Sequence, residues 1–274
     1  MIIDEIIKKG LLELSSKANA SYRIDNIILG KSIYTMKNSD RVFNDINICL
    51  VILEQGYGFA YFQSEFNFES FQNFVNRDLR EILKTPVPPY LKVAIADAIY
   101  SVLNNLNKRY RYKNLRGELR TKARQRAKVL VEEIPIGSKV LLLGASSEII
   151  EECNNKNMQL TVLDLEPTKI GLEFSKIIIE DSAKLLEEKI EKAEYIIATG
   201  MIFVSESADT ILNYSRINNR RLILYMETGS NFGRELLDFG AYRVLSEIFP
   251  YYDFSGDTKY FMHKKKVISF PSLI

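Results

Sequence analysis

The sequence has little of the chemistry that metal centres and redox sites usually need. Its 274 residues include two cysteines, one histidine and no tryptophan. Cys49 and Cys153 are far apart and form no CxxC pair, so we expect two buried free thiols. A zinc site built from Cys and His is therefore nearly excluded. A Ser-His-Asp triad is disfavoured, because it would have to use the single histidine, His263, which stands beside three lysines near the C-terminus.

Long apolar runs and an excess of one charge are also lacking. No uncharged apolar run approaches the roughly 20 residues of a membrane span, and residues 1–14 have the pattern of an amphipathic helix rather than a signal peptide. The 37 basic and 35 acidic side chains leave a net charge of +2. Composition as a whole therefore favours neither a membrane nor a nucleic-acid partner, and we expect a cytoplasmic protein.

The chain length predicts two domains, at roughly 100–200 residues for each. Residues 1–134 have the pattern of a small α+β domain. It begins with a helix to about residue 17 and continues with a β-hairpin over 46–62, whose turn contains two glycines. Pro86, Pro88 and Pro89 precede a helix over 91–106. The sequence Ile134-Pro135-Ile136-Gly137 marks the boundary to a second domain over 135–274.

The second domain alternates apolar strands with helices. We expect strands over 139–143, 160–163, 176–179, 195–198 and 221–226, and helices over 148–155, 183–192, 207–214 and 232–239. This alternation is typical of a parallel sheet covered by helices on both faces. The predicted fold class is therefore α/β, with a Rossmann-like domain in the second half of the chain.

Ligands of such sheets bind beyond the carboxyl ends of the strands, and polar residues follow four of them. Gly144 and Ser146 open a helix whose amides favour an anion, although Ser146 could equally be a plain N-cap. The GxGxxG fingerprint is incomplete, which argues against a dinucleotide. Asp164 lies 20 residues after Gly144, where nucleotide-binding and methyltransferase-like domains hold ribose hydroxyls. A solvated loop acid is the alternative.

The other two strand ends combine glycine with hydroxyl and carboxyl groups. Glycine allows a ligand to approach the backbone, and hydroxyls can hold its polar groups. Catalytic residues cannot be assigned from these patterns. The candidate ligand-binding residues are Gly144, Ser146, Asp164, Thr199, Gly200, Ser205, Glu227, Thr228, Gly229 and Ser230.

Residues 108–128 contain ten basic side chains and a single acid, Glu118, with Tyr110 and Tyr112 interleaved. The pattern over 115–131 predicts a helix. Such a stretch could bind phosphate or nucleic acid, or it could be a solvated helix face. The small net charge of the chain favours the solvated face.

The order of these segments resembles the heavy-metal chelation family, a domain of unknown function. Its members join a domain like the N-terminal domain of enolase to a Rossmann-like domain, and the resemblance covers nearly the whole chain. The matching segments are 48–53 with Gly58-Phe59-Ala60, the helix 94–106, 140–144, 164–167, 193–205 and 227–230 before Gly240. The chain departs from the family at Ser205, where Asn is usual, and at 227–230, where Gly-Pro-Ser is usual.

The resemblance implies a site in the cleft between the two domains. There we expect an anionic or metal-chelating small molecule, with catalysis left open. A metal ion or a metal chelate is the first cofactor to consider, in an oxygen-rich site because soft ligands are scarce. S-adenosylmethionine and a dinucleotide rank below it. The alternative function is a non-catalytic binding or regulatory module that contacts nucleic acid through 108–128. A homo-oligomer is left open.

Overall fold

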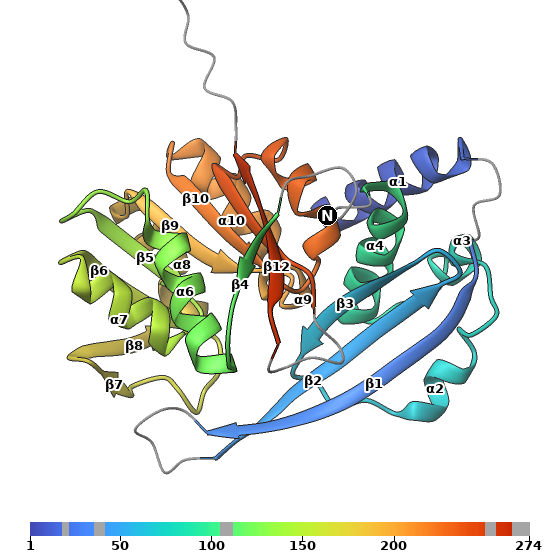
Figure 1. Cartoon of the computed structure of the whole chain (residues 1–274), viewed down its shortest axis with the longest axis horizontal. Helices are drawn as coiled ribbons and strands as arrows, with labels where there is room; N and C mark the ends of the chain where they lie inside the picture. Colours follow the sequence, from blue (N-terminus) through green and yellow to red (C-terminus); the bar gives the residue numbers. More distant parts are fainter. Residues whose placement is uncertain (18–21, 36–41, 105–111, 250–255, 265–274) are drawn as a thin grey trace, which may run out of the picture.

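A computed structural model describes residues 1–17, 22–35, 42–104, 112–249 and 256–264 of the chain. It contains a nine-stranded mixed sheet and a separate three-stranded antiparallel sheet, which lie on opposite sides of the molecule in Figure 1. The mixed α/β class predicted from the sequence is confirmed.

The larger sheet has the strand order β4-β12-β11-β10-β9-β5-β6-β8-β7. Six neighbouring strands, from β11 to β8, run parallel, while β4, β12 and β7 run antiparallel to their neighbours. The bounds are β4 Lys113–Leu115, β5 Lys139–Leu143, β6 Gln159–Asp164, β7 Glu173–Phe174, β8 Ile177–Asp181, β9 Tyr195–Thr199, β10 Arg221–Met226, β11 Arg243–Glu247 and β12 Thr258–Lys264. The parallel core has the strand order of a Rossmann sheet.

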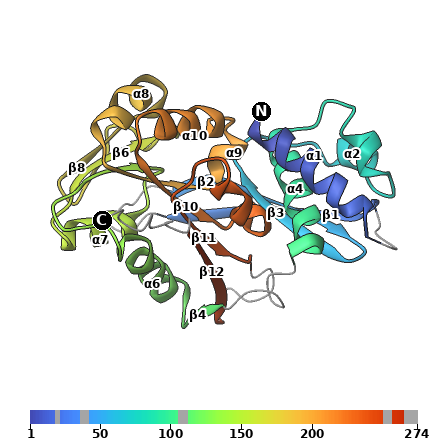
Figure 2. The same ribbon diagram turned by 90° about the horizontal axis from the view of Figure 1, so that it is seen from above.

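Helices cover both faces of this sheet, as its continuous apolar strands predict. Within β5, Leu141 and Leu143 face one core and Val140 and Leu142 face the other, because successive side chains of a strand point to opposite faces. Figure 2 shows the helices above and below the strands. They are α6 (Leu119–Val131), α7 (Ser147–Asn155), α8 (Ser182–Lys192), α9 (Met201–Val204), α10 (Ala208–Ile217) and the 3-10 helix η1 (Ser230–Leu237).

The smaller sheet has the order β1-β2-β3 and packs against a long buried helix, α4. α4 contacts β3 on one side and both α1 and η1 on others, so it is apolar almost all round. Gly58 of β3 permits this packing, because a Cβ there would lie 2.1 Å from the Ala94 carbonyl oxygen. The elements are α1 (Ile2–Ser15), β1 (Ile24–Thr35), β2 (Val42–Leu53), β3 (Gly56–Phe62), α2 (Phe68–Gln72), α3 (Leu79–Ile82) and α4 (Pro89–Asn104).

Several sequence predictions differ from the structure in detail. The helix expected over 232–239 is the 3-10 helix η1, and the helix expected over 115–131 is the short strand β4 followed by α6. β4 belongs to the larger sheet and α6 packs against it, although both precede residue 135. The division at 134/135 therefore stays a prediction. Cys49 and Cys153 are buried free thiols, as expected.

Candidate functional site

The larger sheet reverses its strand order between β5 and β9. From β5 the chain builds outward through β6 to β8 and then returns to β9 on the other side of β5. The loops after β5 and β9 consequently leave the sheet in opposite directions. In open parallel sheets this is where a crevice forms at the carboxyl ends of the strands.

A pocket of about 250 Å³ lies at this point. Its wall comes from the ends of β5, β6 and β9, from α9 and α10, and from Tyr61 and Gln63 at the end of β3. It therefore lies between the two sheets. Five of the ten residues predicted from the sequence line it, namely Gly144, Ser146, Asp164, Thr199 and Ser205.

The loop between β5 and α7 presents backbone amides at this pocket. Gly144 has a φ of +93° in open space, so its conformation rather than crowding requires glycine. Ser146 occupies the N-cap position, yet within the described residues its side chain makes no cap hydrogen bond. The Ser147 hydroxyl donates to Glu148 Oε2 at 2.8 Å. The first amides of α7 are thus left without a side-chain cap, which favours an anion there.

Asp164 is nearly buried at the end of β6 and already has several partners. Its Oδ2 accepts a hydrogen bond from the Ala145 amide at 2.8 Å, and its Oδ1 accepts one from the Glu166 amide at 2.9 Å. Lys169 Nζ lies 3.3 Å from Oδ2, and both side chains are about nine-tenths buried. Asp164 therefore connects the loops after β5 and β6, and few positions on its carboxylate oxygens remain to accept hydrogen bonds from a ribose.

Lys169 lines the pocket and was not predicted. Its signal in the sequence is weak, because a lysine five residues after an acid in a loop is common. The structure gives it importance, because its ammonium pairs with Asp164 and brings N–H donors to the pocket wall.

Gly200 allows two backbones to pack closely. A Cβ at Gly200 would lie 2.1 Å from the Thr228 carbonyl oxygen. The Thr199 hydroxyl accepts a long hydrogen bond, 3.4 Å, from the Met201 amide. Ser205 Oγ lies 2.9 Å from Ser207 Oγ, and both side chains belong to the pocket.

Residues 228–231, which follow β10, join the larger sheet to β3. The Thr228 hydroxyl accepts a hydrogen bond from the Tyr61 amide at 3.0 Å, and the Gly229 amide donates to the Phe59 carbonyl at 3.1 Å. Thr228 and Ser230 are buried. In the described structure the pocket lining does not include Gly200, Glu227, Thr228, Gly229 or Ser230. The ten predicted residues are therefore divided between the pocket, this packing seam and, for Glu227, a buried polar cluster.

Asp97 of α4 lies at the centre of this seam. Its two carboxylate oxygens accept the amides of Asn231 at 2.6 Å and Phe59 at 2.9 Å. Burial raises the pKa of Asp97 to about 7, although the two amide hydrogen bonds act in the opposite direction. One carboxyl group thus binds α4, β3 and η1 to one another.

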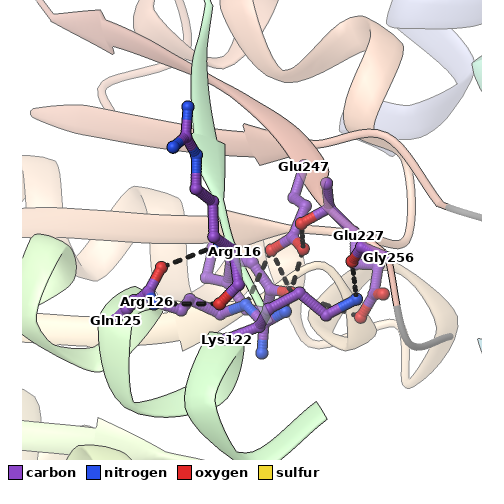
Figure 3. A network of polar contacts seen from close by, with 9 residues as sticks. Arg116, Lys122, Gln125, Arg126, Glu227, Glu247 and Gly256 are labelled. Carbon is purple, nitrogen blue, oxygen red and sulfur yellow. Dashed lines mark hydrogen bonds and ion pairs between the residues drawn. The ribbon is translucent and has the colours of Figure 1, made fainter. Parts of the chain in front are cut away.

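Glu227 belongs to a buried polar cluster at the ends of β10 and β11 (Figure 3). Tyr225 Oη lies 3.2 Å from Glu227 Oε2 and 3.1 Å from Glu247 Oε2. Arg126 of α6 donates two hydrogen bonds to Glu247, at 2.7 and 2.9 Å. The Thr258 hydroxyl donates to the same carboxylate at 2.6 Å.

The two carboxyl groups of this cluster have different environments. Burial raises the pKa of Glu227 to about 7, and the negative charge of Glu247 adds to this effect. Burial also opposes the charge of Glu247, but the hydrogen bonds and charge of Arg126 outweigh it and keep that pKa below its usual value. Tyr61 lies close enough to Glu227 for each group to act on the pKa of the other, and it also lines the pocket.

The oxygen-rich metal site suggested by the sequence lacks a suitable set of ligands. Among the described residues, no group of three or more His, Cys, Asp or Glu side chains lies close enough together to hold a metal ion. Asp164 faces a lysine and Glu247 faces an arginine. The side chains present therefore do not fit a bare metal ion.

Some of the basic side chains of helix α6 are buried against the rest of the protein. Lys122 is 2% exposed and its Nζ donates to the Gly256 carbonyl at 2.6 Å, while Arg126 is held by Glu247. Arg120 and Arg124 remain exposed. Residues 108–111 of the predicted basic patch lie outside the described residues.

Among the described residues, no helix combines the length and the apolar sequence that a membrane span requires.

Comparisons with known proteins find similarity in structure but not in sequence. No family model and no curated protein matches the chain. A protein of unknown function from the DUF364 family of Desulfitobacterium hafniense superposes with a TM-score of 0.61 at 14% identity, over 97% of this chain and all of that one. A DUF364 protein of unknown function from Pyrococcus horikoshii gives 0.55 at 15% identity, over the same shares. At these identities the likeness establishes the fold alone, and the chain has the fold of these two DUF364 proteins.

Proposed function

We propose that the chain binds a small anionic metabolite in the pocket between the two sheets. The observation that carries this proposal is the convergence of two anion-favouring features on one pocket. The uncapped amides that begin α7 lie on one wall, and the buried ammonium of Lys169, a donor of N–H groups that pairs with Asp164, lies on another.

The remaining wall indicates the rest of the ligand. Leu143, Met201, Ile202 and Ile211 provide an apolar surface, and the hydroxyls of Thr199 and Ser205 can orient polar groups. The volume, about 250 Å³, is just below the roughly 300–1,000 Å³ of pockets for drug-sized ligands. A compact metabolite with a carboxylate or phosphate group fits these properties better than a dinucleotide.

A nucleoside ligand is less well supported. The amide of Ala145 and the ammonium of Lys169 occupy the carboxylate of Asp164, which would otherwise hold ribose hydroxyls. Ser146 stands where the second glycine of a dinucleotide fingerprint would be. A pre-formed metal chelate with outward-facing carboxylates would meet the same contacts as any other organic anion.

Binding can be tested by calorimetry and thermal unfolding with tricarboxylates, sugar phosphates and nucleoside monophosphates as probes. A probe at 100 times its Kd should stabilise the protein by about 2.7 kcal/mol. Lys169→Met should weaken its binding, because the substitution removes the charge and keeps most of the length. Lys184→Met is the matched control, since Lys184 is exposed on α8. Equal binding by wild type and Lys169→Met, or no stabilisation by any probe, would contradict the proposal.

A further inference from the structure

We propose that the chain is an enzyme in which Tyr61 exchanges a proton with the ligand in the pocket and Glu227 supplies or receives that proton from behind. This inference rests on the proposed function, because it needs a ligand in the same pocket. It adds a chemical step and assigns that step to two residues. One of them, Tyr61, has no distinctive pattern in the sequence.

Tyr61 is the side chain that the pocket and the buried cluster have in common. It belongs to β3, lines the pocket, and lies close enough to Glu227 to act on the pKa of that carboxyl group. Its ring stands edge-on to Phe59 at 4.6 Å and to Phe249 at 6.0 Å, and these two apolar rings stack on each other. The aromatic packing restricts the orientation of the Tyr61 ring, which belongs to the pocket wall and lies near Glu227.

Hydrogen-bond counting assigns the proton in the cluster. The Tyr225 hydroxyl lies within reach of both carboxyl groups but has a single proton to donate. Glu247 receives two hydrogen bonds from Arg126 and one from Thr258, so it is the charged partner. Tyr225 then donates to Glu247, and Glu227 is the carboxyl group that carries a proton, which the phenol oxygen of either Tyr225 or Tyr61 can accept. The other cation near the cluster, Lys122, is held by the Gly256 carbonyl.

Stability alone does not account for such a cluster. Burying two carboxyl groups and an arginine costs more than packing apolar side chains of similar volume, so a buried ion pair is weak evidence of a structural role. The cluster also lies at the carboxyl ends of β10 and β11, the edge of a parallel sheet where ligands bind. Two neighbouring carboxyl groups whose environments give them different pKa values are a recurring arrangement in acid–base catalysis.

The step conserves protons and moves no other group. In one direction Tyr61 gives its hydroxyl proton to a basic atom of the ligand, and the Glu227 proton passes to the Tyr61 oxygen, leaving Glu227 as a carboxylate. In the other direction the ligand loses a proton to Tyr61 while the original hydroxyl proton moves to Glu227. The ligand class is therefore a small anion that also carries a carbonyl, hydroxyl or acidic C–H group near Tyr61.

The first test needs no ligand. Protein labelled with ¹³C in the glutamate carboxyl groups is titrated, and the Glu227 resonance is assigned by its loss in Glu227→Gln. We expect Glu227 to be protonated at pH 6 and to ionise as the pH rises. Tyr61→Phe should raise its pKa further, because it removes a donor to the carboxylate. Tyr57→Phe, the same change on the same strand, should not. An ionised Glu227 at pH 6, or no response to Tyr61→Phe, overturns the proposal.

The second test detects the chemistry. Wild-type protein is incubated in deuterated water with a small-molecule extract of cells, and metabolites are followed by mass spectrometry. We expect at least one bound metabolite to be converted or deuterated. Tyr61→Phe and Glu227→Gln should keep its affinity and lower the rate by about 10²–10⁴-fold, whereas Glu173→Gln, an exposed carboxyl on β7, should not change it. Binding without conversion or exchange overturns the proton step and leaves the binding function intact. No bound metabolite overturns both.

Discussion

Asp97 allows a sharp test of how the two sheets are held together. Its carboxylate is buried and accepts two backbone amides from different elements. Desolvation disfavours its charge and the amide bonds favour it, and the raised pKa, about 7, means that desolvation dominates. The folded chain therefore holds this proton more tightly than the unfolded chain, in which the pKa is near its ordinary value of 3.8. Between these two values, stability must fall as pH rises.

The size of this effect follows from the difference between the two pKa values. Each whole pKa step corresponds to about 1.4 kcal/mol, so ionising Asp97 in the folded state costs roughly 4 kcal/mol between pH 4 and pH 8. For a chain of this size each kcal/mol moves the melting temperature by about 2–4 °C. Asp97→Asn cannot ionise, yet its amide oxygen still accepts one of the two hydrogen bonds.

The assay is urea unfolding of wild type and Asp97→Asn at pH 5.5 and pH 8. We expect wild type to lose more stability than the variant over this interval. Glu227 has a similarly raised pKa, but it is present in both proteins and its contribution cancels in the comparison. Equal losses by the two proteins, or a wild type that gains stability as pH rises, would refute the reasoning and show that the amide bonds dominate.

Two further predictions concern packing and the buried cluster. Gly200→Ala should destabilise the fold by about 1–3 kcal/mol or more, because its Cβ would lie 2.1 Å from the Thr228 carbonyl oxygen. The control is Gly30→Ala, whose Cβ would have ordinary contacts. Equal melting temperatures of the two variants in thermal unfolding would contradict the expectation. Arg126→Met should cost about 3–5 kcal/mol by leaving Glu247 buried without its partner. The double variant with Glu247→Met should recover most of this loss in urea unfolding, and a strictly additive double variant would disprove the pairing.

The alternation of apolar strands with helices was sufficient to predict the parallel core. The strands β5, β6, β9 and β10 are continuous apolar runs, and these are the ones the sequence identified closely. β11 escaped prediction because it begins with Arg243 and ends with Glu247, two charged residues that are buried through partners far away in the sequence. No local pattern reveals such pairing. β12 is not predicted either, because polar and basic residues interrupt its apolar pattern.

The candidate site was predicted in part because strand ends are recognisable in sequence and their surroundings are not. Gly144, Asp164 and Thr199 meet in one pocket because parallel strands end at a common edge. Thr228 and Gly229 lie at the same edge of the sheet, but β3 packs over them. This packing depends on tertiary structure. Lys169 and Tyr61 were missed because isolated loop lysines and strand tyrosines carry no distinctive spacing.

The most direct test of the central claim, that the pocket binds a small anion, is a comparison of native and denaturing mass spectra with elemental analysis of the same sample. The proteins are wild type and Thr199→Trp, whose larger side chain should fill the pocket, each incubated with a small-molecule extract of cells. We predict a bound organic mass on wild type that disappears on denaturation and is absent from Thr199→Trp. The same mass on both proteins, or none on wild type, would contradict the claim.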